Sequence, residues 1–146
     1  MLWRNTLAVL AGFGVAAVLI VIGLTFNKLW FEELDYINLA QRETIFIYWR
    51  DVLRVAPTAF FVAMLVSGGV ASLVGGLVTA LLVPRARTAY AMIIGFILFI
   101  IAVLDIIIFH GHPTWYQIAL FFIYFPFSWL GGEIIEYLKK KKILPK

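Results

Sequence analysis

Four long apolar runs occupy most of this 146-residue chain, centred near Val15, Ala71, Phe99 and Phe122. Each run is long enough to cross a hydrocarbon layer about 30 Å thick. Hydrophobic residues make up 64% of the chain and charged residues 14%, whereas about a quarter of the residues in a soluble domain are charged. The sequence therefore predicts a membrane-embedded chain with no length left over for a soluble domain.

We expect an all-α membrane protein with four transmembrane helices in a compact bundle, forming a single integral membrane domain. The runs are continuous and do not alternate between apolar and polar residues, which favours helices over barrel strands. The expected helices cover about residues 6–26, 57–83, 88–109 and 114–138. Pro57 suits the first turn of the second helix. The first run is longer than the apolar part of a secretion signal, so we expect it to be a retained helix.

Residues 27–56 form the one long connection, and it is too apolar for a free loop. Phe31, Leu34 and Ile37 have helical spacing, and an apolar run follows at residues 45–49. We expect one or two amphipathic helices in the membrane interface. The leading interpretation is a lid over the outer end of the bundle, and the alternatives are a substrate gate or a docking surface for another subunit.

The basic residues are shared unequally between the two ends of the expected bundle. Eight fall at the end that holds both termini: Arg4, Arg85, Arg87, Lys139, Lys140, Lys141, Lys142 and Lys146. Four fall in the first connection: Lys28, Arg42, Arg50 and Arg54. The positive-inside rule places the more basic end in the cytoplasm. We therefore expect a multi-pass protein of the bacterial inner (plasma) membrane, with its N-terminus and C-terminus cytoplasmic.

Small residues recur at helical spacing in the first two expected helices. The second helix carries Gly68, Ser72, Gly76 and Ala80, flanked by Gly69, Gly75 and Thr79, and the first carries Ala8, Gly12 and Ala16. Helices in lipid approach closely where such residues meet. We interpret the two stripes as one packing seam with the second helix at the centre of the bundle; the alternatives are a conduction path or room for a cofactor.

The fourth expected helix is aromatic and contains Pro126 near its middle. The proline is expected to kink the helix or open its hydrogen-bond ladder. Trp115, Tyr116 and Tyr137 near the two ends fit the aromatic belts at head-group depth. The middle aromatic residues are expected to face lipid or neighbouring helices, and a quinone, pigment or lipid site beside them is the alternative.

Asp105 is the one acidic residue well inside an expected crossing, about one turn before the outer end of the third helix. Ionisable residues at such positions are functional candidates. At this depth the carboxylate is near water, and we expect Arg54 or water to meet it. The leading interpretation is a structural role, either capping or bonding to a neighbouring helix, and the alternative is proton relay or ion coordination.

His110 and His112 follow Asp105 and are weak candidates for a metal site. Histidine and carboxylate are ligands of zinc and copper, but a closed site needs further donors. A glycine between the histidines and a proline after them are more typical of a polar turn. We therefore expect no metal and no cofactor.

The lysine run Lys139, Lys140, Lys141 and Lys142 is expected to fix the topology and to contact anionic lipid. It is too short and too close to the membrane for a nucleic-acid arm. The chain has no cysteine, no phosphate-binding glycine loop, no Ser-His-Asp arrangement and no metalloprotease motif. We therefore expect neither enzymatic activity nor catalytic residues.

Three segments carry a likeness to known sequences: LVGGLVTALL at residues 73–82 with the basic turn after it, PTWY at 113–116, and FPFSWLGG at 125–132. Over about half of its length, from Pro57 to Gly132, the chain resembles a group of small, uncharacterised bacterial four-helix membrane proteins. The resemblance implies the four-helix fold and implies no activity.

The sequence favours a noncatalytic integral membrane protein, either an accessory or structural subunit of a membrane complex or a small homo-oligomer. Its expected partners are the lipid bilayer and other membrane subunits or further copies of itself. One alternative is a small-solute or ion transporter or channel with Asp105 at its outer mouth. Another is a lipid-, quinone- or pigment-binding membrane protein.

Overall fold

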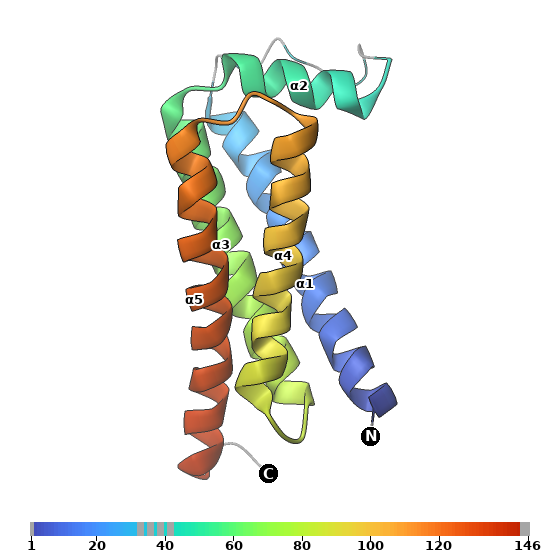
Figure 1. Ribbon diagram of the computed structural model, residues 1–146, viewed down its shortest axis with the longest axis vertical. Helices are drawn as coiled ribbons and strands as arrows, with labels where there is room; N and C mark the ends of the chain where they lie inside the picture. The colour runs from blue at the N-terminus through green and yellow to red at the C-terminus, as the bar shows by residue number, and fades with distance from the viewer. Residues whose placement is uncertain (1, 32–33, 35–36, 38–39, 41–42, 144–146) are drawn as a thin grey trace.

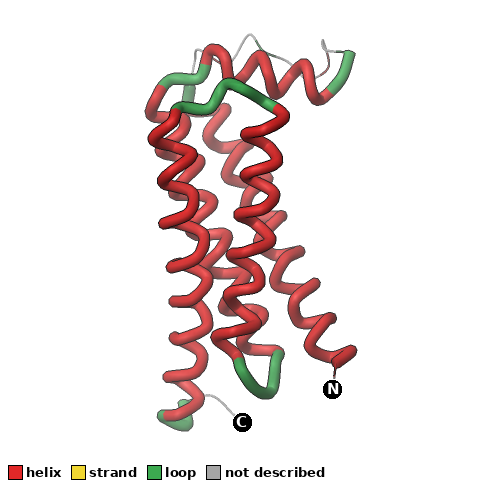
Figure 2. The backbone as a smooth tube through the Cα atoms, in the orientation of Figure 1, coloured by secondary structure: helices red, strands yellow, loops and turns green. Residues whose placement is uncertain are grey.

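Apolar runs bounded by prolines and polar turns fold into helices because each helix satisfies its own backbone hydrogen bonds. In a computed structural model the order of elements is α1 (Leu2–Trp30), α2 (Ile45–Val55), α3 (Thr58–Leu82), α4 (Arg87–Ile108) and α5 (Thr114–Lys140). Residues 2–31, 34, 37, 40 and 43–143 are described, and this part of the chain contains no strand. Helices α1, α3, α4 and α5 are long and apolar enough to cross a membrane. The prediction of an all-α, multi-pass membrane protein is confirmed (Figures 1 and 2).

The predicted boundaries of α3, α4 and α5 lie within two residues of those in the structure, but the prediction for α1 is too short at both ends. The helix continues from Phe26 to Trp30 because Asn27 and Lys28 do not stop it. The Lys28 ammonium donates to the carbonyl of Ile37 at 2.6 Å, so the charge is satisfied by the following connection. Among the charges used for the topology argument, Arg42 and Lys146 lie outside the described residues.

Helix α3 is the central helix of the bundle, as the small-residue pattern predicts. It packs against α1, α4 and α5, while α5 also packs along α4. Helix α1 packs mainly on α3 and makes a smaller contact with α4. Figure 1 shows α3, α4 and α5 running side by side, with α1 inclined away from them toward its N-terminus, and both termini at the same end of the bundle.

The small-residue stripe of α3 faces α5, which corrects the predicted pairing with α1. A Cβ on Gly68 would lie 3.0 Å from the Tyr124 hydroxyl, and one on Gly76 would lie 2.7 Å from the Ser128 carbonyl. Between them, the Ser72 hydroxyl donates to the Tyr124 carbonyl at 2.8 Å. The four-residue repeat is therefore the contact surface for α5, where the backbones come closest.

The stripe of α1 forms a separate seam with the flanking residues of α3. A Cβ on Gly12 would collide with the Thr79 hydroxyl and would lie 2.5 Å from the Gly75 carbonyl oxygen. The Thr79 hydroxyl also contacts the Ala8 carbonyl at 3.4 Å, and a Cβ on Gly75 would lie 2.9 Å from that of Ala16. Two small faces about a quarter-turn apart let α3 hold two neighbours at once.

Helix α5 remains continuous through Pro126, which lies on an exposed face. Its buried face repeats every four residues: Tyr116, Leu120, Tyr124, Ser128 and Gly132. At the end of this face, a Cβ on Gly131 would lie 2.5 Å from the Leu73 carbonyl of α3, and one on Gly132 would lie 2.7 Å from Thr88 Cα of α4. The glycine pair therefore gives α5 close contact with two helices at one level.

Helix α2 lies across the ends of the transmembrane helices at the end opposite the termini (Figure 1). Its N-cap is Thr44, whose hydroxyl accepts a 3.3 Å hydrogen bond from the Ile47 amide. The buried residues Leu34, Ile37, Val52 and Phe60 form one apolar cluster beneath it. The predicted interfacial amphipathic segment is confirmed, and it covers the end of the bundle.

Candidate functional site

The site nearest to the predicted polar residues is a cluster beneath α2 in which three elements meet at Asp105. The Trp49 indole of α2 donates to Asp105 Oδ1 at 2.9 Å. His112, in the turn between α4 and α5, brings Nε2 to 2.9 Å from Asp105 Oδ2. The carboxylate side chain retains 30% of its exposure. One acidic group at the end of α4 therefore joins α2 and the turn between α4 and α5.

His112 is an internal residue although its sequence is that of a polar turn. Its side chain is fully buried, its Nδ1 lies 3.0 Å from the Phe109 carbonyl, and its ring stacks on Tyr116 at a centroid distance of 5.4 Å. A carbonyl only accepts, so Nδ1 carries the hydrogen. Nε2 approaches Asp105 at ion-pair distance but without hydrogen-bond alignment. The contact is thus electrostatic when the ring carries both protons.

The structure does not bring the other predicted residues of this end to Asp105. Arg54 is exposed on α2, and Trp49 and His112 take the place expected for it. His110 is exposed, whereas His112 is turned inward, so the two histidines do not converge. In the part of the chain that is described, no group of three or more His, Cys, Asp or Glu residues is arranged to hold a metal ion.

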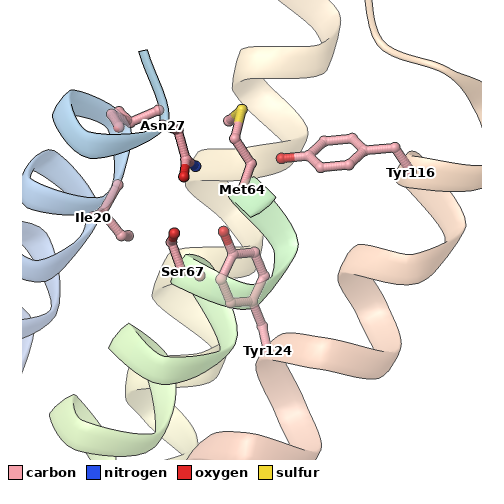
Figure 3. Close-up of a pocket in the computed structure, with 8 residues that line it drawn as sticks. Ile20, Asn27, Met64, Ser67, Tyr116 and Tyr124 are labelled. Carbon is pink, nitrogen blue, oxygen red and sulfur yellow. The ribbon is translucent and has the colours of Figure 1, made fainter. Parts of the chain in front are cut away.

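A small cavity lies deeper in the bundle, between α1, α3 and α5 (Figure 3). Its volume is about 30 Å³, which is close to that of one water molecule. Figure 3 shows the polar ends of Asn27, Ser67 and Tyr124 pointing toward a shared space, with the Tyr116 hydroxyl directed toward Met64. Tyr116 connects this cavity to the cluster at Asp105, because it lines the cavity and its ring stacks on the ring of His112.

The polar groups of the cavity are incompletely bonded within the described residues. The Asn27 amide nitrogen is buried and has no partner there. The Ser67 hydroxyl donates to the Ala63 carbonyl at 2.8 Å. Tyr116 and Tyr124 are 4% and 8% exposed. Buried polar groups of this kind are normally satisfied by protein or by ordered water, so the cavity is a small polar niche in an apolar bundle.

At the opposite end, the lysine run is divided among several contacts. Lys139 Nζ donates to the Leu81 carbonyl at 3.3 Å, Lys140 Nζ lies 3.4 Å from Glu136, and Lys141 Nζ lies 4.7 Å from the centre of the Tyr137 ring. The Thr88 hydroxyl at the start of α4 contacts carboxylate oxygens of Glu133 at 3.1 Å and Glu136 at 3.0 Å. Both glutamates thus join α5 to α4, and Glu136 also pairs with Lys140.

Sequence reasoning missed Trp49, Asn27 and Tyr116 as members of polar sites. Trp49 is 56 positions from Asp105, and no local pattern reports a contact at that separation. Asn27 carried a weak signal, since it is an amide within an otherwise apolar stretch. Comparison with protein-family models, curated proteins and solved structures finds no match for this chain.

Proposed function

We propose that this protein is a noncatalytic membrane protein that assembles through its lipid-exposed helix faces, as an accessory or structural subunit of a membrane complex or as a small homo-oligomer. The observation that carries the proposal is that the buried hydroxyl side chains in the middle of the bundle bond to backbone carbonyls of the chain itself. Ser72, Thr79 and Ser128 are all fully buried. Their hydroxyls contact the carbonyls of Tyr124, Ala8 and Phe125 respectively.

This arrangement bears on function because a transport path needs polar groups directed into a passage. Ser72 and Thr79 instead connect α3 to α5 and α1, and Ser128 bonds within its own helix. These three hydroxyls are thereby committed to the fold. What remains for interaction is the outer surface, which is apolar along α1 and α4.

The outer face of α1 is the surface proposed for assembly. Leu7, Leu10, Val18 and Val21 are each between 49% and 62% exposed on it. Gly14 lies among them, and a Cβ at this position would meet nothing within 4 Å. A glycine between larger side chains leaves a depression that accepts a ridge of another helix. Since Gly14 is not needed for packing inside the chain, contact with a second helix gives it a role.

Substitution of Gly14 by leucine tests this proposal. The protein is purified in mild detergent, and its mass and copurifying subunits are determined by native mass spectrometry. We expect the wild type to carry a stoichiometric partner or further copies, and Gly14→Leu to lose them without a fall in its own helix content or melting temperature. Ala89→Leu, a matched enlargement on the exposed start of α4, is expected to retain them. A wild type that is purely monomeric, without partner, contradicts the proposal.

A transporter or channel is the second candidate function, and the polar niche between α1, α3 and α5 is the observation that favours it. Together with Asp105 and His112, the niche places polar groups along the outer half of the bundle. Solute or proton flux in proteoliposomes is the test. Flux that is unchanged in Asp105→Asn, in His110→Ala/His112→Ala and in Tyr124→Phe counts against this candidate.

We further propose that the end with both termini faces the cytoplasm of a bacterium, with the protein in the inner membrane. The basic residues at that end support this orientation through the positive-inside rule. Because the chain lacks cysteine, single cysteines introduced at His110 and at Lys142 report the orientation by labelling with a membrane-impermeant thiol reagent. Labelling at residue 110 and protection at residue 142 in intact cells is the expected result, and the reverse contradicts it.

A further inference from the structure

We propose that the groove at the basic end of the bundle binds the phosphodiester head group of an anionic glycerophospholipid. The groove lies where the start of α1, the turn between α3 and α4, and the end of α5 meet. Its volume is about 730 Å³, a size typical of small-molecule sites. The proposal requires only that the chain resides in a membrane, and it is independent of the assembly proposed above.

The charge of the groove is strongly unbalanced. It is lined by five cationic side chains: Arg4, Arg85, Arg87, Lys139 and Lys140. Among the described residues, Glu136 is the single carboxylate in the lining, and it already contacts Lys140 at 3.4 Å and Thr88 at 3.0 Å. The three arginines therefore converge without an acidic partner in that lining, which is the electrostatic requirement for an anion site.

The arginine chemistry favours phosphate. The Arg87 guanidinium donates through Nη2 to the Pro84 carbonyl at 2.9 Å, so its position is fixed by the turn. Its Nε is buried and has no partner among the described residues. Arg4 and Arg85 are exposed at the same groove. Guanidinium groups bind phosphate oxygens through several parallel N–H donors, which makes such a set more selective than lysines alone.

The walls of the groove identify a lipid as the source of the phosphate. Leu81 and Leu82 line it and are 46% and 48% exposed, and they belong to the last turn of a membrane-spanning helix. A head group held by the arginines therefore lies at the level of the helix ends, with its acyl chains along the apolar surface of the bundle. A soluble phosphate compound uses the same cations but leaves this apolar wall uncovered.

The groove also divides the lysine run at residues 139–142, which the sequence predicts to contact lipid as one group. Lys139 and Lys140 line it, whereas Lys141 and Lys142 do not. Lys141 lies over the Tyr137 ring instead. Two positive charges can therefore be removed inside the groove or beside it, at the same end of the molecule, and this gives a matched comparison.

The experiment compares Arg4→Gln/Arg85→Gln with Lys141→Gln/Lys142→Gln in the full-length protein. Each variant is delipidated in mild detergent and titrated with phosphatidylglycerol or phosphatidylcholine, and bound lipid is counted by native mass spectrometry. We expect the wild type to bind one phosphatidylglycerol in preference to phosphatidylcholine. The affinity is expected to fall about 30-fold in the arginine variant, since each cation that contacts the head group contributes a factor of about 5. It is expected to fall less than threefold in the lysine variant, because Lys141 and Lys142 do not line the groove.

Three outcomes overturn the proposal. Equal losses in the two variants mean a diffuse attraction without a site, and equal binding of the two lipids means that the head-group charge is not recognised. Saturable binding of inorganic phosphate or pyrophosphate that displaces the lipid assigns the groove to a soluble phosphate. Circular dichroism and thermal unfolding of both variants establish that the fold is retained. A further variant, Arg87→Lys, keeps the positive charge but loses the parallel N–H donors of the guanidinium, and it is expected to bind the lipid more weakly than the wild type.

Discussion

The Trp49 indole donates a 2.9 Å hydrogen bond to the carboxylate of Asp105, and this contact joins helix α2 to the C-terminal end of α4. The same carboxylate lies 2.9 Å from Nε2 of His112. One acidic side chain thus holds two covering elements on the bundle. Asp105, which the sequence marks as a functional candidate, connects α4 to α2 and to the turn between α4 and α5 in the structure.

Replacement of Trp49 by phenylalanine is expected to loosen α2. A smaller aromatic ring is retained, but the hydrogen bond to a charged acceptor is lost, at a cost of about 1.5–3 kcal/mol. Hydrogen exchange measured by mass spectrometry checks this, with faster exchange expected in α2 and unchanged exchange in α3. Tyr48→Phe is the control on the neighbouring ring. Equal protection of α2 from hydrogen exchange in the wild type and in Trp49→Phe would mean that this hydrogen bond does not hold α2 on the bundle.

Asp105 and His112 are expected to be energetically coupled. Asp105→Asn removes the charge and His112→Phe removes both ring nitrogens while keeping a ring against Tyr116. Partners in direct contact show interaction energies of about 0.5–3 kcal/mol. A double-mutant cycle by equilibrium unfolding in detergent micelles measures this value. Additive effects of the two substitutions indicate that the 2.9 Å approach contributes nothing to stability.

Gly12 and Gly14 are expected to respond oppositely to alanine. A Cβ at Gly12 meets Thr79 and Gly75, whereas one at Gly14 meets no atom within 4 Å. Overpacking at a helix seam costs about 1–3 kcal/mol, and alanine at an open helical site is favoured over glycine by about 0.5–1 kcal/mol. Thermal unfolding of the two variants gives the comparison. Similar melting temperatures contradict the close contact of α1 with α3.

Ala86 is expected to be more stable as glycine. Its φ of 51° and ψ of 42° place it in the left-handed region, at the N-cap of α4. A residue with a side chain costs the folded state about 1–2 kcal/mol in that region. Glycine removes this cost, but its greater freedom in the unfolded chain offsets about 0.4–1 kcal/mol of the gain. Equilibrium unfolding should therefore show a gain of about 0.5–1 kcal/mol for Ala86→Gly. Ala89→Gly, inside α4, should show a loss of similar size.

The crossings were predictable because each is a continuous apolar segment of the sequence. Pro57 and Pro84 mark the two ends of α3, and Pro113 marks the start of α5. The pairing of the helices was only half predictable. The stripe at Gly68, Ser72 and Gly76 identified a contact surface, but a stripe does not name its partner, and the structure pairs it with α5.

The polar cluster was less predictable than the fold. Asp105 was visible as an acid in an apolar helix, whereas Trp49 is in a different element and looked like one more interfacial aromatic residue. His112 looked like part of a solvated turn, and only the packing of Phe61 and Tyr116 around it places it inside. Contacts between distant positions decide such sites, and a single sequence does not contain them.

The dependence of α1 on α3 has a consequence for how the chain is built into the membrane. Residues 6–26 contain no charged side chain, so this part of α1 is stable in lipid without a neighbour. Its packing partner, the Gly75 and Thr79 seam of α3, is synthesised roughly sixty to seventy residues later. Helix α1 therefore remains a separate span until α3 has been synthesised, and its docking on α3 is a step of helix assembly rather than of insertion.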